Sequence, residues 1–176
     1  PEDQGGLNGG ALYVDSEASF RPERICEIAQ ARGLDPDAII KRIILAEAYN
    51  SDHQCLILEK ADKVIKENNI KLVIVDSIMS HFRSEYQGRE NLPPRQQRLN
   101  RHLHQLMRLA RMFNLVGFIT NQVIANPQAS FIPGLDWDAA GGHVLKHTPG
   151  LRLKVRKAGA NMRVATVVDS SFIPWS

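Results

Sequence analysis

Acidic residues stand at the ends of two apolar, β-branched runs of this sequence. The run 72–75 leads into Asp76, and the run 11–14 leads into Asp15 and Glu17. A carboxylate beyond the end of a parallel strand can hold a metal-bound water beside a phosphate, or can orient an attacking water as a general base. A structural role is equally open, because an acid can cap a turn or the first turn of the next helix.

A third apolar run, residues 115–119, is followed by Thr120, Asn121 and Gln122. Side-chain amides can sense a phosphate oxygen through hydrogen bonds, although Asn is also a common turn residue. Parallel strands present their carboxyl ends at one edge of a sheet. Three polar ends at one edge therefore favour a binding site more strongly than any one of them does.

The elements that must position these residues follow from the pattern of apolar and turn residues. Short runs rich in Val and Ile predict strands, and helical patterns lie between them. The predicted strands are residues 11–15, 43–46, 71–76, 115–120, 150–156 and 162–169, and the predicted helices are residues 22–32, 36–41, 52–68 and 94–114. This alternation predicts an α/β fold with a mainly parallel sheet flanked by helices, and the last two strands predict an antiparallel hairpin.

Two stretches, residues 81–93 and 124–142, are predicted to be long loops. The first combines arginines such as Arg83 and Arg89 with the aromatic ring of Tyr86. Arginine beside aromatic rings suits contact with the phosphates and bases of a nucleic acid. An ordinary solvated loop remains open as the alternative.

Positive charge is concentrated in two segments. The net charge is +3, yet residues 81–111 carry seven arginines against two acids, and residues 141–176 carry six basic residues against one acid. Such segregation is typical of a protein with an anionic partner, and a solvated basic face explains it equally well.

Composition and length exclude several classes of protein. With 176 residues, 43% of them hydrophobic, the chain is predicted to form one globular domain, residues 1–176. No apolar run approaches the roughly 18 residues of a membrane span. The acidic, Gly-rich start is unlike a secretory signal, and Cys26 and Cys55 are predicted to be free thiols, so we expect a cytoplasmic protein.

Six segments of the chain occur in the same order as in a known family. They read DSEASFRPERI, AYNSDHQ, LVIVDSIMSHFRSEYQGR, RQQRLNRHLHQLMRLA, TNQV and GGHVLKH. From Gly5 to about Pro174 the sequence closely resembles the archaeal RadA recombinases and their eukaryotic strand-exchange relatives. The resemblance implies a RecA-like P-loop ATPase core, an archaeal cytoplasmic location, and ATP and magnesium as cofactors.

The resemblance also implies roles for the residues at the strand ends. Glu17 matches the glutamate that activates the water attacking ATP, and Asp76 matches the Walker B aspartate, which contacts magnesium through water. Gln122 matches the amide that connects the nucleotide with a DNA-binding loop, and Arg24 matches an arginine that stacks on adenine. Further nucleotide-binding positions are Ser77 and, toward the nucleotide of a neighbouring subunit, His147, Asp169 and Pro174.

Members of the family form filaments on single-stranded DNA and pair them with double-stranded DNA. By resemblance, the DNA-binding positions are Arg83, Tyr86, Arg89 and Arg95 in or beside a first loop, and Val123, Gly141 and Gly142 in a second loop, residues 123–142. The filaments use an apolar pocket that accepts a phenylalanine of an adjacent subunit or peptide, matched by Leu12, Val14, Ile44, Ala46, Ile57, Ala61 and Val64. The same pattern is typical of interior packing between a strand and a helix.

The chain departs from the family in three ways. It contains no Gly-Lys-Ser or Gly-Lys-Thr, so the Walker A loop that cradles phosphates is absent from these 176 residues. We therefore expect a core truncated at both ends. The acidic motif has Ala18 where the family has glycine, and Asp136 and Asp138 in the second loop would repel phosphate.

Two functions follow from these observations. The first is part of an ATP-dependent recombinase for DNA repair and homologous recombination, whose parent protein is a DNA-dependent ATPase but which is inactive by itself. The alternative is a RecA-like module that binds DNA or protein without hydrolysing ATP.

Overall fold

The structure is a computed structural model, which describes residues 2–125, 137–160 and 162–173. The chain forms two compact units, Pro1–Ala140 and Gly141–Ser176. Within the described ranges, no helix is long and apolar enough to cross a membrane.

The first unit is built on a four-stranded sheet with the strand order β2-β1-β3-β4. The strands are β1 (Gly10–Asp15), β2 (Ile43–Glu47), β3 (Ile70–Asp76) and β4 (Val116–Ile119). All neighbouring strands are parallel, which confirms the predicted α/β fold. Asp15 lies opposite Asp76 in the register, so both acids reach the same edge of the sheet.

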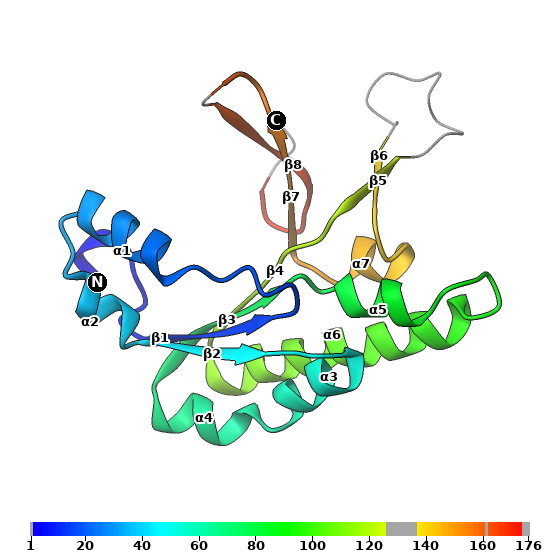
Figure 1. Cartoon of the computed structure of the whole chain (residues 1–176), viewed down its shortest axis with the longest axis horizontal. Helices are drawn as coiled ribbons and strands as arrows, with labels where there is room; N and C mark the ends of the chain where they lie inside the picture. The colour runs from blue at the N-terminus through cyan, green and yellow to red at the C-terminus, as the bar shows by residue number, and fades with distance from the viewer. Residues whose placement is uncertain (1, 126–136, 161, 174–176) are drawn as a thin grey trace. The chain divides into compact units, whose positions relative to one another are not determined.

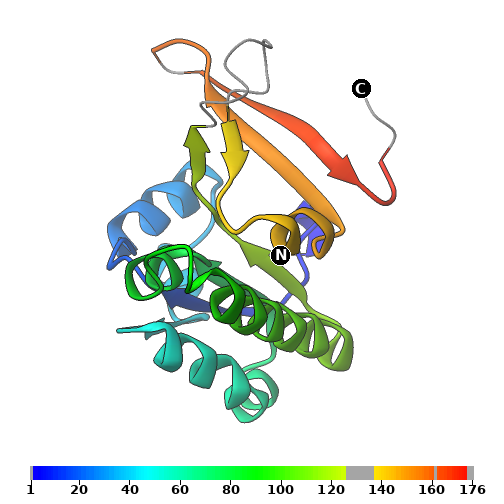
Figure 2. The same cartoon turned by 90° about the vertical axis from the view of Figure 1, so that its right-hand side faces the viewer.

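Helices lie before and between these strands, and several of them cover one face of the sheet. They are η1 (Glu2–Gln4), α1 (Pro22–Ala31), α2 (Pro36–Ile40), α3 (Ser51–Glu59), α4 (Ala61–Glu67), α5 (Ser80–Glu85) and α6 (Leu92–Phe113). Figures 1 and 2 show α3, α4 and α6 together on one side of the strands.

Two sequence predictions about these helices are wrong. The predicted helix 52–68 is interrupted at Lys60, where φ is −102° and ψ is 6°. Buried residues on either side of Lys60 continue the apolar pattern, which therefore does not reveal the break. Residues 81–93 are not one loop, because α5 extends to Glu85 and carries the fully buried Phe82.

The core of the first unit lies between the sheet and the helices α3, α4 and α6. Val14 and Val75 are fully buried in the two central strands. Along α6, Leu99, Leu103 and Leu106 are buried at the spacing that the sequence predicts for its apolar face. This packing fixes the central strands and therefore the positions of the residues at their carboxyl ends.

The opposite face of the sheet carries exposed apolar side chains. Leu45 is 41% exposed, Val116 48% and Phe118 51%. Near the centre of this face, the ring of Tyr13 packs on Phe20 with ring centroids 4.9 Å apart. Parallel sheets normally bury both faces, so this apolar surface is unusual for the fold.

His102 of α6 is a buried histidine whose ionisation is coupled to folding. It is 2% exposed, and its Nε2 lies 3.2 Å from Nε2 of Gln54. Burial, and to a smaller extent the charge of Arg98, lowers the pKa of His102 from 6.5 to about 4. The folded protein therefore keeps His102 neutral over a pH range in which the unfolded chain takes up a proton.

We expect the free energy of unfolding to be highest above pH 6.5 and to fall as the pH decreases toward 4, with His102 contributing a loss of roughly 3 kcal/mol. Urea unfolding at several pH values measures this loss, which should be smaller in His102→Gln. His104→Gln, at an exposed position of the same helix, is the control. Identical pH dependence in the unchanged chain and in His102→Gln would contradict the prediction.

Two short strands occupy part of the second predicted loop. β5 (Val123–Ala125) pairs in antiparallel fashion with β6 (Trp137–Ala139). The prediction that residues 124–142 are all loop is therefore wrong for residues 124–125 and 137–139. Residues 126–136, including Asp136, lie outside the described residues.

The second unit contains α7 (His143–His147) and the antiparallel strands β7 (Leu151–Lys157) and β8 (Arg163–Ser170). The predicted terminal hairpin is confirmed. Within it, Nε of Arg152 lies 3.3 Å from a carboxylate oxygen of Asp169.

Candidate functional site

The polar residues expected to act together lie where β1, β3 and β4 end. Hydrogen bonding between the strands continues beyond them, because the Ser16 N–H donates to the Asp76 carbonyl at 2.8 Å and the Thr120 N–H donates to the Val75 carbonyl at 3.1 Å. The three segments are therefore held side by side at one edge of the sheet, as their sequences predict.

Three hydroxyl groups contact the carboxylate of Asp76. Thr120 Oγ1 donates to Oδ1 at 2.5 Å, the Tyr13 hydroxyl donates to Oδ2, and the exposed Ser19 hydroxyl donates to Oδ2 over a longer distance of 3.5 Å. Burial raises the pKa of Tyr13 above its ordinary value, and the hydrogen bond to Asp76 raises it further, so this hydroxyl stays protonated and remains a donor. Each oxygen of Asp76 thus has a fixed donor, which sets the plane of the carboxylate.

Asp15 has a different structural role from Asp76, although each of them is the last residue of a strand. It is 3% exposed, and its carboxylate accepts the N–H of Glu17 at 3.0 Å and the N–H of Phe20 at 2.8 Å. Burial by itself would raise the pKa of Asp15, but these backbone donors outweigh it and lower the pKa. Asp15 therefore shapes the turn that carries Glu17.

Ser16 and Ser77 join the first two strand ends. The Ser16 hydroxyl accepts the Ser77 N–H and donates to the Ser77 carbonyl, both at 2.8 Å. The hydroxyl of Ser77 is buried and has no hydrogen-bond partner among the described residues. The alternative that an acid after β1 caps the next helix is wrong, because the N-cap residue of α1 is Arg21 and no side chain caps it.

Gln122 connects Glu17 with Arg83. Its side-chain amide donates to a Glu17 carboxylate oxygen at 3.3 Å, and its carbonyl oxygen accepts from Arg83 at 3.1 Å. These three residues come from the end of β1, from α5 and from the segment after β4. The structure therefore brings an acid of the strand-end cluster into contact with an arginine of the predicted first loop through one amide.

A cavity of about 330 Å³ lies beside this contact. It is lined by Ser77, Met79, Ser80, Arg83, Ser84 and Gln122. Hydroxyl, amide and guanidinium groups dominate this lining, so the cavity suits a polar or anionic group better than an apolar one.

The other predicted site residues of the first unit lie on α1, on α5, between α5 and α6, and at the start of α6. Arg83 and Arg89 are exposed, Tyr86 and Arg95 are partly buried, and Arg95 is in the first turn of α6. Arg24 is exposed on α1, where it pairs with Glu27 at 2.7 Å. No contact in the described part of the chain brings Arg24 to Asp76.

Predicted residues of the second unit are His147, Asp169, Gly141 and Gly142. His147 is exposed at the end of α7, and Asp169 pairs with Arg152. Gly141 and Gly142 have φ values of 104° and 64°, a region that favours glycine. Pro174 lies outside the described residues.

The residues of the predicted apolar pocket lie on one face of the β1–β2 pair and on the helices α3 and α4. Leu12 pairs with Ile44 in the register and Val14 with Ala46. Leu12, Val14 and Ala61 are buried, and Ile44, Ala46, Ile57 and Val64 are half-buried.

Sequence reasoning missed the roles of Tyr13 and Thr120 as donors to Asp76. For Tyr13 a signal was present, because it precedes Asp15 by two residues and so lies on the same face of β1. For Thr120 the signal was its place at the predicted strand end, but the sequence analysis gives a role only to the amides of Asn121 and Gln122 and none to the Thr120 hydroxyl. The hydroxyl groups reach Asp76 only through the pairing of three strands.

The sequence of this chain is similar to those of known proteins. The family model described as Rad51 matches residues 1–176. The DNA repair and recombination protein RadA of Aeropyrum pernix is 54% identical over 174 residues, which cover 99% of this chain and 54% of the relative. The proteins of the same name from Metallosphaera sedula and Ignicoccus hospitalis are 50% and 49% identical, again over 99% of this chain and over 53% and 54% of their own lengths. The chain thus spans about half the length of these relatives.

Proposed function

Because this chain belongs to the Rad51 family and has its RecA-like α/β core, we propose that it is the catalytic part of an ATP-dependent recombinase. The recombinase would form filaments on single-stranded DNA and promote homologous strand exchange in DNA repair and recombination. The observation that carries this proposal is the contact of Gln122 with both Glu17 and Arg83, since it links an acid at the strand ends to a candidate DNA contact.

Asp76 is proposed to contact magnesium through water, and Glu17 to orient the water that attacks ATP. The residues suit a magnesium nucleotide: magnesium takes oxygen ligands and is usually bound by one or two carboxylates plus phosphates. Hydroxyl donors orient the Asp76 carboxylate, and the buried Ser77 hydroxyl has no hydrogen-bond partner within the described ranges. Magnesium would neutralise developing charge on the phosphates, while the exposed Glu17 accepts a proton from water.

Gln122 is proposed to make this chemistry respond to DNA. Arg83 donates to Gln122, and Gln122 donates to Glu17. When Arg83 binds a phosphate of DNA, the Gln122 carbonyl loses its donor and the amide can turn away. Glu17 is then free to accept a hydrogen bond from water instead.

Filament formation is the second part of the proposal. The cluster of Leu12, Val14, Ala61 and their neighbours would receive a phenylalanine from an adjacent subunit or from a peptide. His147, Asp169 and Pro174 would reach the nucleotide of a neighbouring subunit, and Arg24 would stack on adenine. Val123, Gly141 and Gly142 would belong to a second DNA-binding loop, and the site of action would be the archaeal cytoplasm.

We expect the chain to bind a single-stranded oligo-dT, and the double variant Arg83→Ala, Arg89→Ala to bind it less tightly. If both arginines contact phosphates, the slope of log affinity against log salt should fall by roughly 1.4, because each contact contributes about 0.7 on single strands. Fluorescence anisotropy over a salt series measures both quantities. Arg32→Ala, Arg42→Ala removes the same charge from exposed positions and is the matched control. An unchanged slope in the first variant would remove these arginines from the contact surface.

A second candidate function is a RecA-like module that binds DNA or protein without hydrolysing ATP. The two candidates differ in magnesium-dependent turnover of ATP. Turnover by this chain that Glu17→Gln abolishes would exclude the second candidate.

A further inference from the structure

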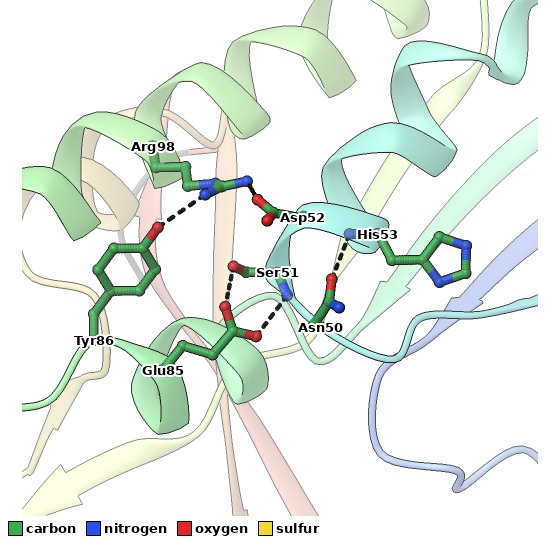
Figure 3. A network of polar contacts seen from close by, with 7 residues as sticks. All are labelled: Asn50, Ser51, Asp52, His53, Glu85, Tyr86 and Arg98. Atoms are coloured by element: carbon green, nitrogen blue, oxygen red, sulfur yellow. Dashed lines mark hydrogen bonds and ion pairs between the residues drawn. The ribbon is translucent and has the colours of Figure 1, made fainter.

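The C-terminal end of α5 is attached to the start of α3 through Glu85. One carboxylate oxygen of Glu85 accepts the Ser51 N–H at 2.7 Å, and the other accepts the Ser51 hydroxyl (Figure 3). Ser51 is the first residue of α3 and is fully buried. A carboxylate at this position also interacts favourably with the positive end of the helix dipole.

Arg98 of α6 makes a second attachment beside the first. Its guanidinium donates to the Tyr86 hydroxyl at 2.9 Å and forms an ion pair with Asp52, as Figure 3 shows. Tyr86 immediately follows α5, and its ring stacks on the buried Phe82 with centroids 6.4 Å apart. The side chain of Arg98 is 32% exposed and that of Asp52 is 73% exposed, so solvent screens the ion pair strongly, and the hydrogen bond to Tyr86 is the less exposed of the two contacts.

Together these contacts fix the chain at residues 85 and 86 against two other helices. Asn50 reinforces the same corner, because its side chain caps α3 by accepting the His53 N–H at 2.7 Å. Arg83 and Arg89 lie on either side of the fixed point and are exposed. The charge of Arg98 is engaged with Asp52, and the hydroxyl of Tyr86 is engaged with Arg98.

We propose that Glu85 and Arg98 are positioning residues, which hold residues 83–89 so that Arg83 and Arg89 face a nucleic acid, and that Tyr86 belongs to this anchor. The inference rests on the proposed function and deepens it. In this proposal, Arg83 and Arg89 contact the phosphates. Arg98 and Tyr86 do not contact them but hold residues 83–89 in the required orientation.

Amide hydrogen exchange in Arg98→Gln and Glu85→Gln tests the anchor without any ligand. The amides of α5 and the Leu92 N–H, which donates to the Arg89 carbonyl at 3.2 Å, report on the segment. We expect them to exchange about tenfold faster in both variants, because each loses contacts between helices. Arg101→Gln, at an exposed position of the same helix, is the control and should leave the rates unchanged. Unchanged rates in both anchor variants would overturn the proposal.

Binding of oligo-dT then separates positioning from direct contact. Arg98→Gln should lower the affinity severalfold with no change in the salt slope, and adding Tyr86→Phe should lower it no further. A slope reduced by about 0.7 would make Arg98 a phosphate contact, and additive losses would make Tyr86 a contact itself; either would overturn the assignment. Unchanged affinity in Arg98→Gln, with the chain folded by circular dichroism, would also overturn it. If the unchanged chain does not bind, the proposed function fails, and the exchange rates still decide whether the anchor exists.

Discussion

Replacing Phe82 by alanine is expected to remove a large part of the free energy of unfolding of the first unit. Phe82 is fully buried in α5, and its ring centroid lies 6.4 Å from that of Tyr86 and 6.0 Å from that of His102. Truncation of such a side chain leaves a cavity and costs about 3 to 5 kcal/mol, out of a typical total stability of roughly 5 to 15 kcal/mol. Urea unfolding followed by circular dichroism measures the loss.

Phe172→Ala is the matched control for this experiment. Phe172 is 69% exposed, so its removal should change stability by less than about 0.5 kcal/mol. A similar small loss for Phe82→Ala would mean that α5 does not pack on α6 as described, and the anchor at Glu85 and Tyr86 would lose its support as well.

Removing the two closest hydroxyl donors of Asp76 is expected to weaken the binding of a divalent cation. Tyr13→Phe keeps the ring on Phe20, and Thr120→Val keeps the shape of the side chain. Only the longer Ser19 contact of 3.5 Å then remains, so the Asp76 carboxylate can rotate. Loss of such supporting contacts typically costs 10- to 100-fold in metal affinity. Electron paramagnetic resonance with Mn²⁺ in place of Mg²⁺, in the presence of ATP, measures the affinity of the double variant.

Two further variants make this result decisive. Tyr49→Phe removes a hydroxyl from a tyrosine that is 74% exposed and should leave the affinity unchanged. Asp76→Asn tests the metal site itself. If Asp76→Asn abolishes binding and the double variant binds normally, the hydroxyls do not position the carboxylate. If Asp76→Asn has no effect, the proposed role of Asp76 fails.

The apolar pattern predicts the main elements of the fold because it records which residues are buried. Runs rich in Val and Ile predict β1, β2, β3 and β4 to within one residue at each end. The break at Lys60 escapes prediction because burial continues across it, and α5 escapes because its six residues are rich in polar side chains. Periodicity reports the environment of side chains and is insensitive to a short interruption of the backbone.

For the candidate site, the residue pattern shows which polar residues end the strands, and the parallel order predicts that they meet. The role of each residue follows from its contacts in the folded chain. Asp15 accepts backbone N–H groups, whereas Asp76 is held by hydroxyls of Tyr13 and Thr120. The fold also brings Tyr86 into contact with Arg98, and it places Gln122 between Glu17 and Arg83. A hydrogen bond requires donor and acceptor to be about 3 Å apart in space. These partners are far apart in the sequence, so they come within that distance only when the strands and helices pack together.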